Sequence, residues 1–285
     1  MSQPKNHHYI SQTHIKKFFN QNSKDIYVYD KRYRTIKTKL SSKKIFSEEN
    51  LNTMLTKEGF DYKTVEDHLN INFENDFNKH FSIIHKYLET KQIQEETKKS
   101  LLFFAKYASI GNSRNPEYKK EVDDLFFYSL QPYYTAATTE QKKEFYKHFR
   151  PFGDKKYSNF PNDLEIAESI LRRMGKINFI IFVPENIDDY FILPDYCSLT
   201  IREKINTYFN PDIREISIIG FPLSSKIYIE FYSEKSCNSP EVSGILKITS
   251  KQIQSINQSS LILANKIVAC EDKIYLENLV SKTLV

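Results

Sequence analysis

The segment NHHYISQTHIKKF, residues 6–18, contains the side chains best suited to acid–base chemistry. His7 and His8 are adjacent in it, and imidazole is the side chain whose ordinary pKa lies nearest to neutral pH. Either ring can exchange protons with a substrate or bind a metal ion. Neighbouring side chains on an extended chain point to opposite sides, so we expect only one of the pair to face a site. His8 is the better candidate, and a solvated leader is the competing interpretation.

Arg114 and Asp195 are two further candidates. Arg114 stands before Asn115 and Pro116 at the expected end of a helix, where its guanidinium can hold a phosphate or a carboxylate through two N–H groups. Capping of the preceding helix explains this arginine somewhat better. Asp195 follows an expected strand and lies in a turn, which suits metal or proton chemistry. An Asx-turn accounts for Asp195 as well.

Glu66 and Glu74 lie beside an apolar stripe of an expected helix. They are eight residues apart, roughly 12 Å along a helix axis, and so cannot easily share one metal ion. Either glutamate can face a cleft, but we favour a structural role in which one of them pairs with the basic N-terminal segment. If the chemistry needs Mg²⁺, Asp195 together with Glu66 or Glu74 is the predicted site, since oxygen ligands suit that ion.

Residues 1–44 form a basic segment, here called the basic arm, with 11 Lys or Arg and two Asp. The chain as a whole has a net charge of only +5, so the rest of the chain is mildly acidic. Cations interleaved with aromatic rings are the ingredients of a nucleic-acid surface. A lysine-rich solvated surface explains the same pattern equally well. The residues predicted to contact nucleic acid are Lys16, Lys17, Lys31, Arg32, Tyr33 and Arg34.

The elements that must position these residues follow from periodicity and caps. Ser11 reads as the N-cap of a short helix that also carries Gln12, and DIYVYDKRYRTIKTKL reads as a hairpin. Apolar spacings of three and four predict a helix over 64–89. Further helices are predicted at 92–110, 117–131, 139–148, 162–174, 250–269 and 271–282, and strands at 177–183, 190–193, 214–220 and 226–232.

These elements predict an α+β fold, with a short N-terminal helix and β-hairpin, a helical middle, a later antiparallel or mixed sheet, and C-terminal helices. We expect one domain over 1–285, with a possible division into 1–175 and 176–285. Asn257 shares a helix face with Ile253 and Leu261, so its amide must find partners in the interior. We interpret Asn257 as a core bracket, with a site group as the alternative.

Composition excludes several classes of protein. No stretch approaches the roughly 20 apolar residues that span a bilayer, and the N-terminus lacks the apolar core of a signal peptide, so we expect a cytoplasmic protein with no membrane partner. The three cysteines, widely spaced and without a CxxC pair, read as free thiols. Phosphate-loop, dinucleotide-binding, zincin and α/β-hydrolase motifs are absent from the sequence.

Several segments, in this order, resemble the bacterial family catalogued as domain of unknown function 4238. The opening HHYISQTHIKKF is similar to its His-His-Tyr signature, with Ser11 where the family usually has Pro; Gln12 matches. VEDHLNINFEND resembles its paired-Glu helix, SRNP its Arg-x-Pro segment, and FILPDYCSL its strand ending in an Asp turn. The resemblance spans nearly the whole chain and implies no settled activity, although proteins of this family look at home among bacterial defence and toxin genes.

Three functions fit these observations. The first is a nuclease that serves as a toxin or phage-defence effector, with RNA favoured over DNA as its substrate. In it the basic arm holds the backbone, His8 exchanges protons and Arg114 stabilises charge on phosphorus. The second is a binding module that docks on nucleic acid or a partner protein without chemistry. The third and weaker one is an enzyme acting on a small phosphorylated metabolite.

Overall fold

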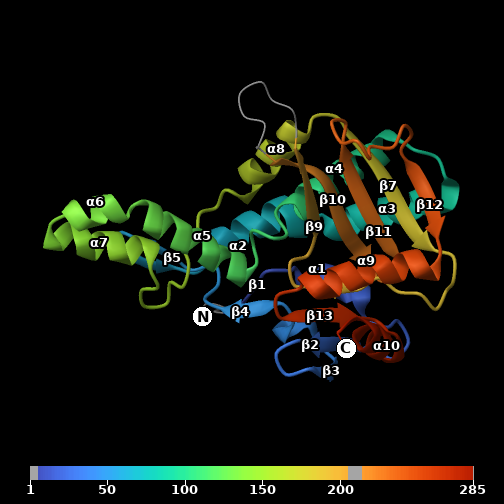
Figure 1. The fold of residues 1–285 in the computed structure, drawn as a ribbon, viewed down its shortest axis with the longest axis horizontal. Coiled ribbons are helices and arrows are strands. Elements are labelled where there is room, and N and C mark those ends of the chain that lie inside the picture. Colours follow the sequence, from blue (N-terminus) through green and yellow to red (C-terminus); the bar gives the residue numbers. More distant parts are fainter. Residues whose placement is uncertain (1–5, 205–213, 285) are drawn as a thin grey trace.

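The computed structural model describes residues 6–204 and 214–284 and confirms the mixed α+β class (Figure 1). Its largest sheet has five strands, in the order β12-β7-β11-β10-β9, and a second sheet has the order β3-β2-β13-β8. The strands of the larger sheet are β7 (Ile177–Pro184), β9 (Leu199–Lys204), β10 (Arg214–Ser224), β11 (Ile227–Ser233) and β12 (Gly244–Ile248). Those of the smaller sheet are β2 (Ile26–Asp30), β3 (Thr35–Lys39), β8 (Leu193–Pro194) and β13 (Ile267–Cys270).

The larger sheet is mixed, which is one of the two arrangements predicted, since β12 runs parallel to β7 while the other pairs are antiparallel. The middle of the chain is helical, and its helices lie close to the predicted ranges. They are α2 (Thr64–Leu69), α3 (Phe77–Thr90), α4 (Glu95–Ser109), α5 (Pro116–Ser129), α6 (Gln131–Ala136), α7 (Thr139–Phe149) and α8 (Asp163–Met174). Helices α4 and α8 contact each other and β10.

The opening histidines belong to a strand. β1 (Asn6–His8) pairs antiparallel with β4 (Ser47–Glu49), so that His7 lies opposite Glu48 and His8 opposite Ser47. The short α1 (Gln12–Ile15) follows, and continues into the 3₁₀ turn η1 (Lys16–Phe18). The interpretation of residues 6–8 as a solvated leader is therefore wrong, because cross-strand hydrogen bonds fix their backbone.

Ser11 caps α1 as predicted. Its hydroxyl accepts a hydrogen bond from the backbone N–H of His14 at 3.2 Å. Ile10 and Ile15, on either side of this cap, are completely buried. The hydrophobic contact and the cap together anchor the entry into α1.

The predicted hairpin is β2 and β3. Asp30 closes its turn by accepting hydrogen bonds from the backbone N–H groups of Arg32 and Tyr33. β3 forms the outer edge of the smaller sheet, while β2 lies inside it and pairs with β13. A 3₁₀ turn, η2 (Ser42–Lys44), leads from the hairpin to β4, and a small second hairpin follows as β5 (Met54–Thr56) and β6 (Gly59–Asp61).

The helix predicted over 64–89 is interrupted by a π-turn, η3 (Asn70–Glu74), between α2 and α3. The backbone N–H of Asn75 donates to the carbonyl of Asn70, five residues earlier, at 3.0 Å. The apolar stripe still faces the core, since Val65, Leu69 and Phe73 are at most 2% exposed. Insertions of this kind are frequent at functional sites, and this one ends at Glu74.

The C-terminal region departs from prediction after α9 (Ser250–Leu263). The predicted helix extended to 269, but Ile267–Cys270 is the strand β13, which joins β2 to β8. The strand prediction at 190–193 also shrinks to Leu193–Pro194. Helix α10 (Lys273–Thr283) follows as expected. β13 thus pairs with β2, so that segments near the two ends of the described chain belong to one sheet (Figure 1).

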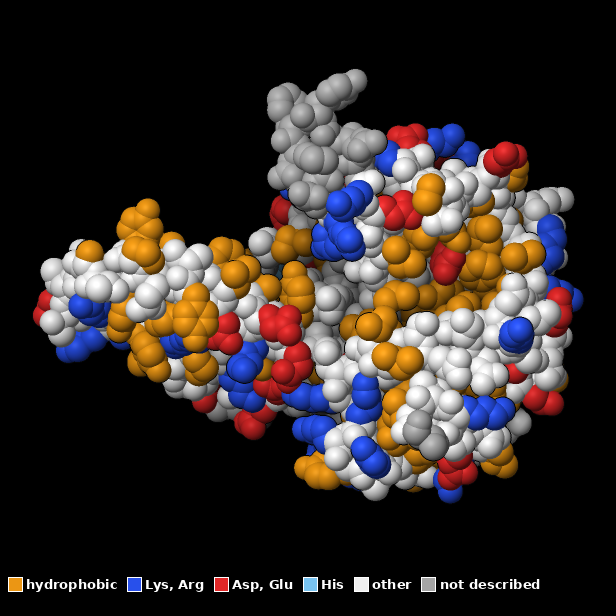
Figure 2. Space-filling model, in the orientation of Figure 1, with side chains coloured by type: hydrophobic (Ala, Val, Ile, Leu, Met, Phe, Trp, Pro, Cys, Tyr) orange, Lys and Arg blue, Asp and Glu red, His pale blue; other side chains and the backbone are white. Residues whose placement is uncertain are grey.

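Helices α5, α6 and α7 extend away from the sheets, at the left of Figure 1. Figure 2 shows hydrophobic side chains on the surface of this extension. The main core lies elsewhere, and combines buried side chains from Tyr9 to Ala269, including Phe77, Phe104 and Phe221. Among the described residues, no helix is long and apolar enough to cross a membrane.

Candidate functional site

Next to β1 lies a group of polar side chains, linked by hydrogen bonds and electrostatic interactions, that we call the polar cluster. Its members come from β1, the loop after β4, α2, η3, the start of α5 and the loop before α8. The polar cluster consists of His7, His8, Asn52, Glu66, Glu74, Arg114, Lys119 and Asn159. Five of these residues were predicted as site residues from the sequence.

His7 is held by the backbone of Asn52. Its Nδ1 accepts a hydrogen bond from the Asn52 N–H at 2.9 Å, and the side chain is 1% exposed. A ring nitrogen that accepts a hydrogen bond carries no proton, so the neutral His7 ring carries its proton on Nε2. The sequence predicted that only one of the two histidines faces a site. In the structure His7 is buried in the cluster and His8 lies at its partly exposed side.

Asn52 is the hub of the cluster. Its side-chain amide donates to Glu66 Oε1 at 2.5 Å, and its Oδ1 accepts from Lys119 Nζ at 3.0 Å. Lys119 also donates to Asn159 Oδ1 at 2.6 Å, and the Asn159 amide in turn donates to the carbonyls of Leu51 and Thr53, both at 2.9 Å. These hydrogen bonds therefore fix the loop after β4 through both its side chains and its backbone.

The ammonium group of Lys119 is removed from water, and this burial lowers its pKa to about 8. Asp163, Glu66 and Asp123 act in the opposite direction, while Arg114 lowers the pKa further. At pH 7 the group is still largely protonated, but it releases its proton far more readily than an ordinary lysine.

Arg114 joins β1 to the π-turn. Its Nη2 donates to the backbone carbonyl of His8 and to Glu74 Oε1, each at 3.1 Å. Burial raises the pKa of Glu74 above its ordinary value, although the guanidinium opposes that rise. Among the described residues, neither glutamate forms an ion pair with a Lys or Arg of the basic arm. Glu74 pairs with Arg114 and Glu66 bonds to Asn52, which contradicts the structural role favoured from the sequence.

His8 is only partly buried, and its Nε2 lies 3.2 Å from the carbonyl oxygen of Ser42. A carbonyl only accepts, so Nε2 donates and the lone pair of the neutral ring is on Nδ1. Burial lowers the pKa of His8 below its ordinary value, against the effects of the Ser42 bond and Glu66. Burial thus favours the neutral form of the His8 ring, which can accept a proton.

Three buried side-chain polar atoms have no hydrogen-bond partner within the part of the chain that the structure describes. They are Asn50 Oδ1, Thr53 Oγ1 and Arg114 Nε. All three belong to the polar cluster or to the loop that it holds in place. Buried polar atoms without partners are rare because each forgoes hydrogen bonds that water would supply. The polar cluster and its loop therefore contain a hydrogen-bond acceptor and hydrogen-bond donors that have no partner among the described residues.

Asp195 is a structural bracket. Its carboxylate accepts hydrogen bonds from the backbone N–H groups of Asn265, Lys266 and Ile267 at 2.6 to 3.1 Å. Burial raises its pKa, and these three donors oppose the rise. The backbone carbonyl of Asp195 accepts a hydrogen bond from the Asn115 amide, next to Arg114 of the cluster, at 2.7 Å. The carboxylate fixes the turn that starts β13.

Asn257 is a core bracket, as the sequence indicated. Its Oδ1 accepts from the N–H of Ile192 at 3.2 Å, and its amide donates to the Tyr190 carbonyl and the Tyr275 hydroxyl. Gln12 has a similar bracing role, since its Oε1 accepts from the Ser42 hydroxyl at 2.9 Å. These bonds connect α9 to α10, and α1 to η2.

The side chains predicted from the sequence to contact nucleic acid have different surroundings. Lys31 donates to the carbonyls of Leu261, Ile262 and Ala264 at the end of α9, and Arg32 pairs with Asp30. Lys17 lies over the ring of Phe81, 4.1 Å from its centre. The remaining predicted contacts are Lys16, which lines a separate shallow pocket, and Tyr33 and Arg34, which are exposed in the β2–β3 turn.

A metal site is not formed by the residues suggested from the sequence. Both oxygens of Asp195 are bonded to backbone N–H groups. The described ranges 6–204 and 214–284 contain no cluster of three or more His, Cys, Asp or Glu side chains that could hold a metal ion. The cysteines are free, as predicted.

A comparison with family models identifies the chain. The model described as Protein of unknown function (DUF4238) matches residues 6–273. The chain belongs to this family. The match begins at β1 and contains every member of the polar cluster, which confirms the resemblance inferred from the sequence. Searches of curated proteins and of solved structures found no match.

Sequence reasoning missed three members of the cluster in this DUF4238 protein: Asn52, Lys119 and Asn159. The loop residue Asn52 and the α5 residue Lys119 are indistinguishable in sequence from the many other asparagines and lysines of this chain. Asn159 lies next to Phe160 and Pro161, two residues after Tyr157, in a segment for which no element was predicted. Its role follows only from the tertiary structure, since its partners Leu51, Thr53 and Lys119 lie 108, 106 and 40 residues away in the chain.

Proposed function

We propose that this DUF4238 protein is a nuclease that cleaves RNA at the polar cluster. The observation that supports this most is the concentration of the three unpartnered polar atoms, Asn50 Oδ1, Thr53 Oγ1 and Arg114 Nε, around titratable groups with shifted pKa values. Such combinations are typical of active sites, because catalysis needs groups poised near neutral pH and donors without protein partners.

Each step of the reaction has a candidate group. His8 Nδ1 takes the proton of a ribose 2′-hydroxyl, and the oxygen then attacks the adjacent phosphorus. The bond to the 5′-oxygen breaks, and we assign the proton that this leaving group takes up to Lys119. Arg114 Nε–H donates to a phosphoryl oxygen as charge develops there. The products are a 2′,3′-cyclic phosphate and a 5′-hydroxyl.

The cellular role we propose is that of a bacterial toxin or phage-defence effector, which follows from the family resemblance. Two other functions are the alternatives to this proposal. One is a binding module without chemistry, in which the Arg114–Glu74 pair only stabilises the fold. The other is an enzyme acting on a small phosphorylated metabolite.

The test uses purified full-length protein with a labelled single-stranded RNA and the DNA of the same sequence. We expect RNA fragments that end in a cyclic phosphate and no DNA fragments, since DNA lacks the 2′-hydroxyl. The His8→Ala variant should cleave about 100-fold more slowly or worse, in line with the contribution of a general base. His85→Ala, which removes an exposed imidazole on α3, is the matched control and should cleave at the wild-type rate.

Expression in a bacterial host extends this test to the cellular role. Growth arrest with degraded RNA for wild type and His85→Ala, but not for His8→Ala at equal protein level, agrees with the proposal. Equal cleavage by His8→Ala removes that residue from the mechanism. Binding of RNA without cleavage by any of the three proteins supports the binding module instead.

A further inference from the structure

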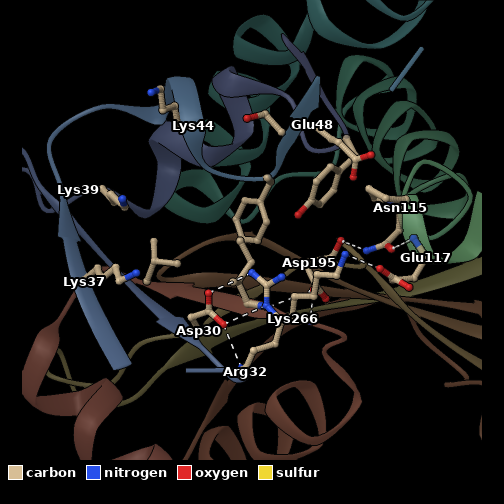
Figure 3. A pocket seen from close by; sticks show the side chains of 16 residues that line it. Asp30, Arg32, Lys37, Lys39, Lys44, Glu48, Asn115, Glu117, Asp195 and Lys266 are labelled. Atoms are coloured by element: carbon tan, nitrogen blue, oxygen red, sulfur yellow. Dashed lines mark hydrogen bonds and ion pairs between the residues drawn. The ribbon is translucent and has the colours of Figure 1, made fainter. Parts of the chain in front are cut away.

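A basic pocket lies beside the polar cluster, and two of its lining residues, Ser47 and Glu48, belong to β4. The cavity has a volume of about 320 Å³ and is bounded by β3, η2, β4, the start of α5 and β13 (Figure 3). Its lining includes five Lys or Arg side chains and four carboxylates. The pocket attracts anions only if some of these cations are not paired with its own carboxylates.

All four carboxylates have their own donors. Asp30 pairs with Arg32, and Glu117 pairs with Lys266. Glu48 accepts hydrogen bonds from Lys156 and from the Tyr157 hydroxyl at 3.1 and 3.0 Å. The fourth, Asp195, is bonded to three backbone N–H groups. None of them therefore neutralises the remaining cations of the pocket.

The remaining cations are Lys37, Lys39 and Lys44. No carboxylate within the described residues forms an ion pair with any of them, and Lys37 and Lys44 are exposed. Figure 3 shows the three lysines on one side of the cavity, opposite Glu117 and Lys266. The Tyr33 ring, 66% exposed, lies beside two lining residues, with Arg32 and Lys37 5.4 and 5.5 Å from its centre.

The pocket and the polar cluster share a wall. Ser47 and Glu48 line the cavity, and they are the cross-strand partners of His8 and His7. Asn115 also lines the cavity, and the preceding residue is Arg114. A chain of phosphates bound in the pocket would therefore lie one strand away from the site of cleavage.

We propose that Lys37, Lys39 and Lys44 bind successive phosphates of the RNA strand, and that Tyr33 stacks on one of its bases. This inference deepens the proposed function, on which the choice of RNA as the ligand rests. Unpaired lysines are point charges that neutralise phosphates, and an exposed ring beside them gives a base a stacking surface. Lysines on an edge strand also prevent sheet-to-sheet pairing, but that purpose does not explain Lys44, which lies outside the strand.

The test separates binding from cleavage by using a fluorescent 2′-O-methyl RNA of 12 nucleotides, which cannot form the attacking 2′-oxyanion. One protein carries Lys37→Gln, Lys39→Gln and Lys44→Gln together. The matched control carries Lys86→Gln, Lys99→Gln and Lys143→Gln, which removes the same charge from exposed positions on α3, α4 and α7. Affinity is measured by fluorescence anisotropy at several salt concentrations.

We expect the pocket variant to bind more weakly and with a salt slope smaller by about 2, because each lost phosphate contact on a single strand removes about 0.7. The control should keep the wild-type slope. Equal slopes for the two variants overturn the inference even if RNA is cleaved. A pocket effect on binding in a protein that cleaves no RNA keeps the inference and rejects the nuclease. Equal competition by a mononucleotide and the oligomer rejects a strand as the ligand.

Discussion

The polar cluster and the surroundings of His14 place histidines of the same short segment in opposite environments. His14 is completely buried, and its ring packs against Phe18, Phe77, Tyr107 and Phe221 with centroid distances of 5.0 to 5.7 Å. His8 lies among charged and amide groups and is partly exposed. The comparison shows what makes a histidine structural and what makes it available for chemistry.

Both nitrogens of His14 are used inside the core. Nε2 donates to the Pro222 carbonyl at 2.8 Å, and Nδ1 lies 3.8 Å from Cys197 Sγ. Burial lowers the pKa of His14 to about 3, against the effect of the Pro222 bond. His14 therefore stays neutral throughout the physiological range, and no substrate reaches it. His8, in contrast, keeps an acceptor nitrogen beside groups that a substrate can approach.

The largest expected effect on stability is that of His14→Ala. Removing the ring leaves a cavity among four aromatic side chains and an unpaired Pro222 carbonyl, which should lower the free energy of unfolding by about 3–5 kcal/mol. Urea unfolding followed by circular dichroism measures the change. His85→Ala serves as the control and should change stability by less than about 0.5 kcal/mol. A stable His14→Ala protein would contradict the structural role of this ring.

The pH dependence of stability gives a second comparison. The pKa of His14 is about 3 in the folded state and about 6.5 in the unfolded state. Between these values His14 is protonated in the unfolded chain but not in the folded protein. Its contribution to the free energy of unfolding is therefore fully present above pH 6.5 and is lost as the pH drops towards 3.

His14→Leu lacks this contribution, and its stability should fall less steeply than that of wild type over the same range. Urea midpoints measured at intervals from pH 4 to 7 give both slopes. Identical slopes would show that His14 is protonated in the folded state, and would remove the contrast between the two environments.

An intermediate effect is expected for the Arg114–Glu74 pair within the polar cluster. Glu74→Gln and Arg114→Met should each destabilise the protein, and the double variant should reveal a coupling of about 1–2 kcal/mol. The single variant Arg114→Met loses the donor to the His8 carbonyl as well, so it should be the more harmful of the two. Strictly additive changes in the urea midpoints would mean that the pair is not formed in solution.

The smallest effect is expected for Lys31→Met. Lys31 donates to three carbonyls at the end of α9, and loss of this cap should cost about 1 kcal/mol. Its affinity for RNA should change less than twofold, unlike that of the Lys37, Lys39 and Lys44 variant. A large loss of RNA affinity would return Lys31 to the binding surface predicted from the sequence.

Much of the secondary structure follows from local signals in this chain. The Ser11 cap, the hairpin around Asp30 and the start of α8 after Pro161 and Asn162 are encoded by residues within a few positions of each other. The π-turn at Asn70–Glu74 and the strand Ile267–Cys270 are not, because both depend on partners outside the segment. β13 forms where β2 offers a free edge and Asp195 holds the preceding turn.

The sequence by itself determined which residues can exchange protons or pair with phosphates, and which stretches favour helix or strand. It singled out His8, Glu66, Glu74 and Arg114 by residue type and family resemblance. Only the tertiary structure decided that Asn52, Lys119 and Asn159 complete the cluster, that Asp195 and Asn257 are brackets, and that His14 is inert. The physical reason is that desolvation and hydrogen bonding depend on neighbours far away in the chain, whereas caps and periodicity depend only on neighbours nearby.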